Sequence, residues 1–214
     1  MAVNKKADLN KFKAYWNYHR ARLWTFEKGR ESAVMIPLVM REDGGTSILF
    51  EVRSSRLNTQ PSEICFPGGG IEGDESPSET ARRETIEELL VRPEQLKLLC
   101  EVDGTIGPSG SPMWAFAGEI RDYQMTFSKD EVEEVFLMPL TWLASAEPEI
   151  YLLSYRANPD EKFPVDTVPG GAEVGKRPWV KEMPVYRYGE YVIWGATARV
   201  LKQFAERMSE AGAL

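Results

Sequence analysis

Three glutamates at close spacing are the residues of this chain best suited to chemistry. Glu84, Glu87 and Glu88 stand at positions i, i+3 and i+4, which share one face of an α-helix. Carboxylates crowded on one face repel one another, so a purely structural role would be an odd use of them. Hard divalent cations such as Mg²⁺ take several oxygen ligands and also bind phosphate oxygens. The pattern indicates a cation site, although a solvated acidic helix face explains the helix equally well when it is considered alone.

Local sequence signals predict the helix that carries these glutamates. Ser76-Pro77-Ser78-Glu79 supplies a capping serine, a proline at the first helical position and a glutamate at the third. The helix should begin at Ser76, run to about Leu90 and stop before Pro93. A Gly-rich turn precedes it. Apolar residues of the helix should face a core, namely Ile86, Leu89 and Leu90.

The rest of the chain predicts a single α/β domain. Apolar, β-prone runs predict strands, with a Gly-rich hairpin turn between the first two: Ser32–Met40, Ser47–Arg53, Ile64–Phe66, Leu96–Val102 and Met113–Ile120. Short helical pieces are expected over Asp130–Val135 and Leu140–Ala146. Residues 155–190 predict a long irregular segment, which in compact domains is often a binding loop or lid. A helix over Glu190–Met208 should close the chain.

Charge is unevenly distributed along the chain. The formal net charge of −7 argues against a nucleic-acid binder, but not against an anionic substrate, because bound divalent cations reverse the local field. Residues 1–30 carry eight Lys or Arg against two acids, and apolar residues near helical spacing predict an amphipathic helix there. That helix would either dock on the domain or form a basic rim near an anionic substrate. We expect a helical extension over residues 1–30 and the main domain over residues 31–214.

Several protein classes are disfavoured by composition. The two cysteines form no CxxC pair, which fits reduced thiols in a cytoplasm. No apolar leader or stretch long enough to span a bilayer is present. The single histidine, His19, nearly excludes a Ser-His-Asp triad or a His-based zinc site. We therefore expect a cytoplasmic protein that binds neither membrane nor nucleic acid.

The spacing around the three glutamates resembles the Nudix box of the Nudix hydrolase superfamily, Gly-x5-Glu-x7-Arg-Glu-U-x-Glu-Glu-x-Gly-U, where U is a bulky aliphatic residue. Gly69 and Glu75 are followed by the run Arg83–Glu88, and every charged position matches. Thr85 and Leu90 replace the usual aliphatic residue and glycine. Glu84, Glu87 and Glu88 are called the box glutamates below. The resemblance implies a Nudix α/β/α sandwich, a mixed sheet between helices, with additional N-terminal and C-terminal helices.

The same resemblance implies roles for the matched residues. The box glutamates and the carbonyl of Gly68 would bind Mg²⁺ or Mn²⁺, and Arg83 would pair with Glu75 and hold the helix in place. The cations would polarise a diphosphate and generate a nucleophilic hydroxide. The general base would be a box glutamate or a carboxylate from a distant loop. Glu131 is the candidate for the second case, although a plain surface charge explains it equally well.

A narrower resemblance precedes the box. Coenzyme A pyrophosphatases carry Leu-Leu-Thr-x-Arg-Ser-x3-Arg-x3-Gly-x3-Phe-Pro-Gly-Gly, and the segment from Leu49 to Gly69 keeps every interval. Ile193–Arg199 is similar to the Ile-Trp-Gly-x-Thr-Ala-Arg opening of the last helix of that branch. Four identities are lost, at Phe50, Glu51, Asn58 and Ser62.

Four residues of this narrower motif are candidates for substrate binding: Arg53, Arg56, Phe66 and Gly69. Arg53 leaves a strand and could reach a phosphate bidentately, with an ordinary surface ion pair as the alternative. Arg56 would supply the guanidinium that is missing at position 58. Phe66 is either a core residue or a substrate contact, and Trp194 either stacks on an adenine or packs.

Together the resemblances imply metal-dependent hydrolysis of the diphosphate linkage of coenzyme A or its derivatives to 3′,5′-ADP and 4′-phosphopantetheine. The alternative enzyme is a Nudix hydrolase for another nucleoside diphosphate derivative, such as ADP-ribose or NADH. The alternative from another class is a non-catalytic, ligand-sensing Nudix module, against which the intact box glutamates argue. The expected partner is a small-molecule diphosphate, and a homodimer is left open.

Overall fold

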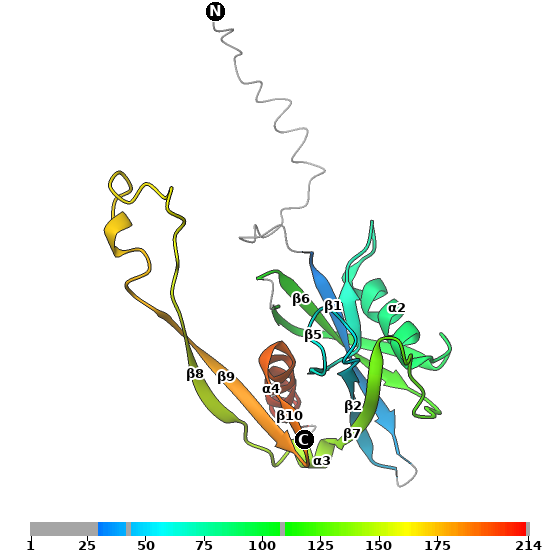
Figure 1. Ribbon diagram of the computed structural model, residues 1–214. Coiled ribbons are helices and arrows are strands. Elements are labelled where there is room, and N and C mark those ends of the chain that lie inside the picture. Colours follow the sequence, from blue (N-terminus) through cyan, green and yellow to red (C-terminus); the bar gives the residue numbers. More distant parts are fainter. Residues whose placement is uncertain (1–29, 42–43, 108–109, 213–214) are drawn as a thin grey trace, which may run out of the picture.

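A mixed β-sheet lies between helices in the computed structural model, which describes residues 30–41, 44–107 and 110–212 (Figure 1). The strands follow the order β3-β2-β1-β6-β5, with β4 paired to β1 and β7 to β2. Strands β1 and β6 run parallel, and the other paired strands of this sheet are antiparallel. The strands are β1 (Ser32–Met40), β2 (Thr46–Arg53), β3 (Ile64–Cys65), β4 (Gly68–Gly70), β5 (Leu96–Ile106), β6 (Pro112–Ile120) and β7 (Val132–Pro139).

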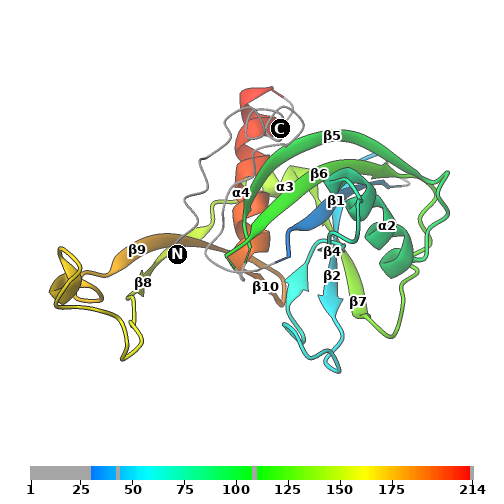
Figure 2. The same cartoon turned by 90° about the horizontal axis from the view of Figure 1, so that it is seen from above.

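Helices cover both faces of this sheet. Helix α2 (Pro77–Leu89) lies on one side and α4 (Gly195–Glu210) on the other, as Figure 2 shows. Residues 33 to 36 of β1 are all buried, and they alternate between two apolar clusters, one under each helix. A strand that is buried on both faces has apolar residues at consecutive positions, which explains the apolar sequence of β1. The short helix α3 (Leu140–Leu143) follows β7.

Helix α2 begins and ends where its sequence predicts. Its N-cap is Ser76, whose hydroxyl accepts a hydrogen bond from the Glu79 amide at 3.3 Å, while the Glu79 carboxylate accepts one from the Ser76 amide at 2.8 Å. This reciprocal capping box satisfies two amides that the helix leaves free. At the other end Leu90 adopts a left-handed conformation with φ 53°. The Nudix box places a glycine there, and glycine is the residue that such a C-terminal cap favours.

The segment that we expected to be irregular contains a strand. Strand β9 (Trp179–Tyr188) pairs with β8 (Glu149–Tyr155), and β10 (Tyr191–Ile193) completes a second sheet of three strands. The β8–β9 hairpin extends away from the body of the molecule (Figure 1). Between its strands lie residues 156–178, where a short 3-10 helix (Gly171–Glu173) is the only regular element among the described residues. The prediction for residues 155–190 was therefore wrong in its last third.

Two further predictions are corrected. The helical piece expected over Asp130–Val135 is a turn followed by β7, because Val132, Val135 and Phe136 are buried along the edge of β2 and strand pairing overrides the local preference. The last helix begins at Gly195 rather than Glu190, because residues 191–193 pair with β9. The helix expected over residues 1–30 falls almost entirely outside the described residues, so the division at residues 30 and 31 stays a prediction.

No helix in the described part of the chain is long and apolar enough to cross a membrane.

Candidate active site

The box glutamates occupy three different environments on α2. Glu88 is buried, Glu84 is half-buried, and the Glu87 side chain is 57% exposed. The three glutamates share the predicted face, but their exposure increases along it from the protein interior to solvent. A cation seated over it would contact an interior carboxylate and a surface carboxylate at once.

Arg83 ties α2 to the loop before it. Its guanidinium donates to both oxygens of Glu75, through Nε at 2.8 Å and Nη2 at 3.1 Å. Its Nη1 donates to Glu84 at 2.9 Å and to Glu87 at 3.2 Å. A planar guanidinium suits such a fork, and the pairing fixes how the carboxylate face is turned. The expected partnership of Arg83 with Glu75 is present.

The Gly-rich segment that we expected to be a turn is strand β4, and it lies directly against the carboxylates. The amide of Gly68 donates to Glu88 Oε2 at 2.8 Å. A Cβ on Gly69 would lie 2.2 Å from Glu84 Oε1, and one on Gly68 would lie 2.4 Å from the carbonyl oxygen of Ala33. A larger residue at position 69 would displace the Glu84 carboxylate, and one at position 68 would press on the backbone of β1. Gly69 therefore leaves room for the Glu84 carboxylate, and Gly68 allows β4 to lie close to β1.

The carboxylates resist ionisation in this arrangement. Burial raises the pKa of Glu88 well above its usual range, and the nearby charge of Glu51 raises it further. Burial also raises the pKa of Glu84, although the hydrogen bond from Arg83 lowers it. A divalent cation would favour the charged forms of both groups.

A fourth carboxylate, which the sequence reading had counted only as a lost identity, belongs to the same cluster. Glu51 is 0% exposed, and its Oε1 accepts a hydrogen bond from the Cys65 thiol at 3.2 Å. Its Oε2 is buried without a partner. Burial is the first cause of the raised pKa of Glu51. The sequence signal was an acidic residue inside the apolar run of β2.

The donor set fits a hard divalent cation. Carboxylate and carbonyl oxygens surround the Gly68–Gly69 turn, and the free oxygen of Glu51 lacks any counterpart within the protein. Within the described ranges, no three or more His, Cys, Asp or Glu side chains are placed so that they could hold a metal ion. Mg²⁺ typically uses one or two carboxylates with water and substrate oxygens, so it does not need a full protein cage. When bound, such a cation would polarise the diphosphate and activate water.

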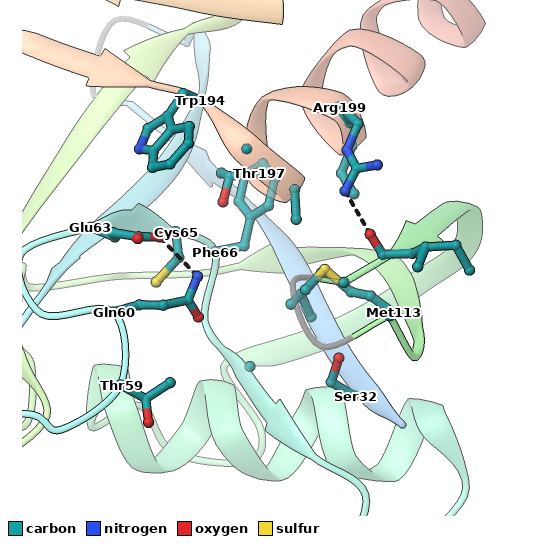
Figure 3. Close-up of a pocket in the computed structure, with 18 of the residues that line it drawn as sticks. Ser32, Thr59, Gln60, Glu63, Cys65, Phe66, Met113, Trp194, Thr197 and Arg199 are labelled. Carbon is teal, nitrogen blue, oxygen red and sulfur yellow. Dashed lines mark hydrogen bonds between the residues drawn. The ribbon is translucent and has the colours of Figure 1, made fainter. Parts of the chain in front are cut away.

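A cavity of about 670 Å³ opens beside the turn (Figure 3). One wall comes from Cys65, Phe66 and the Gly68–Gly70 strand, and another from the first turn of α4. Trp194 and Thr197 reach into it from α4, and Arg199 donates to the carbonyl of Ile106 at 2.6 Å, as Figure 3 shows. Trp194 is 48% exposed, so its ring is open to a ligand.

The structure brings some predicted substrate residues to the cavity and leaves others outside. Arg53, Phe66 and Gly69 line it, and Arg53 Nε is buried without a hydrogen-bond partner. Phe66 is also a core residue, 2% exposed and stacked on Phe50 at 4.9 Å between ring centroids. Arg56 lies elsewhere: its exposed guanidinium donates to the carbonyl of Lys129.

Glu131 is exposed in the turn before β7, where its carbonyl accepts the amide of Ser54 at 2.8 Å. Its charge contributes to raising the pKa values of Glu51 and Glu84, so it lies within electrostatic range of the site. Its role as general base stays a prediction.

Four cavity residues, Tyr155, Lys181, Glu182 and Met183, were missed because they come from the β8–β9 hairpin. Tyr155 and Lys181 line the cavity, and the Lys181 ammonium lies 5.4 Å from the centre of the Tyr155 ring. Nothing local in the sequence marks them, since only the pairing of Leu153 with Lys181 and of Tyr155 with Trp179 brings them together.

The comparisons with known proteins identify the family of this domain. The NUDIX domain model matches residues 29–158, which is more than half of the chain. The chain therefore belongs to the Nudix hydrolase superfamily, whose members act on diphosphate compounds and generally use divalent metal ions such as Mg²⁺ or Mn²⁺.

The chain is similar to several named members of this superfamily. The chain is 30% identical over 178 residues to the uncharacterized Nudix hydrolase NudL of Enterobacter sp. (strain 638), covering 82% of this chain and 81% of that protein. It is 31% identical over 121 residues to the peroxisomal coenzyme A diphosphatase NUDT7 of Mus musculus, covering 56% of this chain and 50% of that protein. A MutT/nudix family protein from Enterococcus faecalis aligns over 96% of this chain and 71% of its own, with 16% identity and a TM-score of 0.49.

Proposed function

We propose that the chain hydrolyses the diphosphate linkage of coenzyme A or its derivatives, with Mg²⁺ or Mn²⁺, to 3′,5′-ADP and 4′-phosphopantetheine. One observation carries the proposal. The two segments that resemble coenzyme A pyrophosphatases, around Arg53–Gly69 and Trp194–Arg199, are far apart in the sequence but line the same cavity beside the box glutamates. The likeness to a coenzyme A diphosphatase over about half of that protein supports it.

The charge of the cavity suits a substrate with several phosphates. Three cationic side chains line it, Arg53, Lys181 and Arg199. Among the described residues, the acidic side chains along the lining are Glu63 and Glu182. Coenzyme A carries a phosphate on its ribose in addition to the diphosphate, whereas ADP-ribose and NADH carry the diphosphate alone. An excess of cations away from the box glutamates therefore favours coenzyme A.

In this proposal the diphosphate lies beside the Gly68–Gly69 turn, where the box glutamates and the Gly68 carbonyl would hold the cations. Arg83 positions the carboxylate face and does not touch the substrate. Glu131, on the turn before β7, would accept a proton from the attacking water. Arg53 would donate to a phosphate oxygen through its unpaired Nε. Trp194 would offer its exposed ring as a stacking surface for the adenine.

A product-resolved screen of coenzyme A, ADP-ribose, NADH and dinucleoside polyphosphates, with Mg²⁺ and with Mn²⁺, tests the substrate. We expect coenzyme A to give the highest kcat/KM. If ADP-ribose exceeds it by tenfold or more, the coenzyme A assignment fails and the superfamily assignment stands. If nothing turns over although ligands bind, the chain is a ligand-sensing module.

A further inference from the structure

The middle of strand β2 contains one acidic residue that the proposed reaction does not yet use. Glu51 is flanked by Phe50 and Val52, and it is as completely buried as the apolar residues around it. One of its oxygens accepts a hydrogen bond from the Cys65 thiol, which is a weak donor. The other, Oε2, has no hydrogen-bond partner. A carboxylate held in this way is unfavourable unless something compensates its charge.

The protein supplies only part of that compensation, because burial raises the pKa of Glu51 more than the hydrogen bond from Cys65 and the charge of Arg53 lower it. Among the described residues, no Lys or Arg lies within ion-pair distance of Glu51. Arg53 is the nearest cation along the strand, but its Nε also lacks a partner. A buried polar atom without a partner in a native protein needs an explanation, and a bound ion is one such explanation.

The position of Glu51 in β2 indicates which ligand it would bind. Leu49 belongs to the apolar cluster under α2, and side chains two residues apart on a strand share a face, so Glu51 also faces α2. Glu51 on β2 pairs with Cys65 on β3. Three residues after Cys65, the amide of Gly68 donates a hydrogen bond to Glu88. The free oxygen of Glu51 therefore belongs to the carboxylate cluster on the inner side of α2, opposite the exposed Glu87.

We infer that Glu51 is a fourth carboxylate ligand of the divalent cations, acting from β2 while the box glutamates act from α2. The Cys65 thiol occupies Oε1 and leaves Oε2 to bind the cation. The coenzyme A pyrophosphatase motif has threonine at this position, so this chain adds a charge that the motif lacks. The inference rests on the proposed function, in that it needs cations at the box glutamates.

Direct binding of Mn²⁺, measured from the electron paramagnetic resonance signal of the free ion, tests this without relying on turnover. The variants are Glu51→Gln, which keeps the shape, and Glu51→Thr, which restores the residue of the motif. We expect both to bind Mn²⁺ at least tenfold more weakly than the wild type or to lose one bound ion. Glu133→Gln is the matched control, since Glu133 is an exposed acid that only accepts the Ser55 amide, and it should bind as the wild type does.

Glu88→Gln separates the failure of this inference from the failure of the proposed function. If Glu88→Gln loses Mn²⁺ while both Glu51 variants bind it normally, Glu51 is not a ligand and the proposed function stands. If Glu88→Gln also binds normally, the box glutamates are not the cation site and both ideas fail. If Glu51→Gln does not fold, Glu51→Thr decides, and failure of both to fold would make Glu51 a structural residue and overturn the inference.

Discussion

The cavity is built from two regions that are held in opposite ways. Helix α2 is capped at its start, clamped by Arg83 and packed on β1 through Ala81 and Leu89, both 0% exposed. The β8–β9 hairpin stands away from the body (Figure 1), although at its base β10 pairs with β9 and Tyr186 is buried. Toward its tip Leu152, Trp179 and Val180 are exposed, and a hairpin with so few contacts there is only marginally stable.

This difference separates the reaction from the choice of substrate. The carboxylates that would bind cations are on the rigid region, where small errors of position are costly. Tyr155 and Lys181 line the cavity from the hairpin, away from the box glutamates, so we expect them to act on substrate binding. Changes in α2 should therefore alter the rate of the chemical step, and changes in the hairpin should alter affinity.

The largest effect is expected from Glu88→Gln, on the rigid side. Removing one buried cation ligand should lower kcat by on the order of a hundredfold or more, because it removes the electrostatic effect that the cation supplies. The measurement is initial-rate kinetics at saturating Mg²⁺. Turnover close to that of the wild type would show that this face of α2 is not the active site.

A smaller effect, of a different kind, is expected from Lys181→Ala in the hairpin. Losing one cation at the cavity wall should raise KM for coenzyme A roughly tenfold, the usual size of one charged hydrogen bond, and leave kcat within about twofold. The same kinetic assay measures both constants. A large fall in kcat with unchanged KM would mean that the hairpin helps to form the reacting geometry, and would break the comparison.

The clamp on α2 should show a pH dependence of known sign. The hydrogen bonds from Arg83, and secondly from Thr80, lower the pKa of Glu75 from 4.5 to about 2. A depressed folded-state pKa contributes stability above the unfolded pKa, and that contribution is lost as the pH falls from about 4.5 to about 2. We expect Glu75→Gln to lower the urea midpoint at pH 7 and to flatten its fall below pH 4.5. Parallel curves for the two proteins over that interval would contradict the clamp.

The smallest expected effect is a gain in stability at the end of α2. Leu90 holds a left-handed conformation while its side chain is 57% exposed, so it bears the strain and gains little packing. Leu90→Gly should stabilise the protein by roughly 0.5–1 kcal/mol, after the entropy that glycine adds to the unfolded chain is counted. Thermal denaturation measures it. A lower Tm would mean that the Leu90 side chain packs more than its exposure indicates.

The sequence predicted what local signals determine. The capping box, the proline at Pro77 and the spacing of the box glutamates fix α2 within the helix itself, and its bounds were predicted almost to the residue. The β1–β2 hairpin was found for the same reason, since its alternation and turn are contiguous.

What the sequence did not reveal depends on pairing between distant segments. Strands β8 and β9 are exposed along much of their length, so they show no apolar period, and their register is set by pairing across a long connection. The start of strand β7 was predicted to be helical because two adjacent acids, Glu133 and Glu134, interrupt the apolar pattern of the buried residues that pair with β2. In the sequence, Glu51 was only a departure from the coenzyme A pyrophosphatase motif. Its place beside the box glutamates depends on α2, which comes from a later part of the chain.

The central claim is that the box glutamates form a cation site, where cation binding relieves the burial of the carboxylates and the repulsion between them that Arg83 offsets only in part. Melting scans of the wild type and of the double variant Glu87→Gln with Glu88→Gln, in EDTA and in Mg²⁺, test it most directly. A cation at a hundred times its Kd adds about 2.7 kcal/mol to the stability of a protein that binds it only when folded. We expect the wild type to gain this in Mg²⁺, and the variant to melt at or above the wild type in EDTA, to gain little from Mg²⁺ and to be inactive. A variant that melts well below the wild type in EDTA would show instead that these glutamates are paired structural residues.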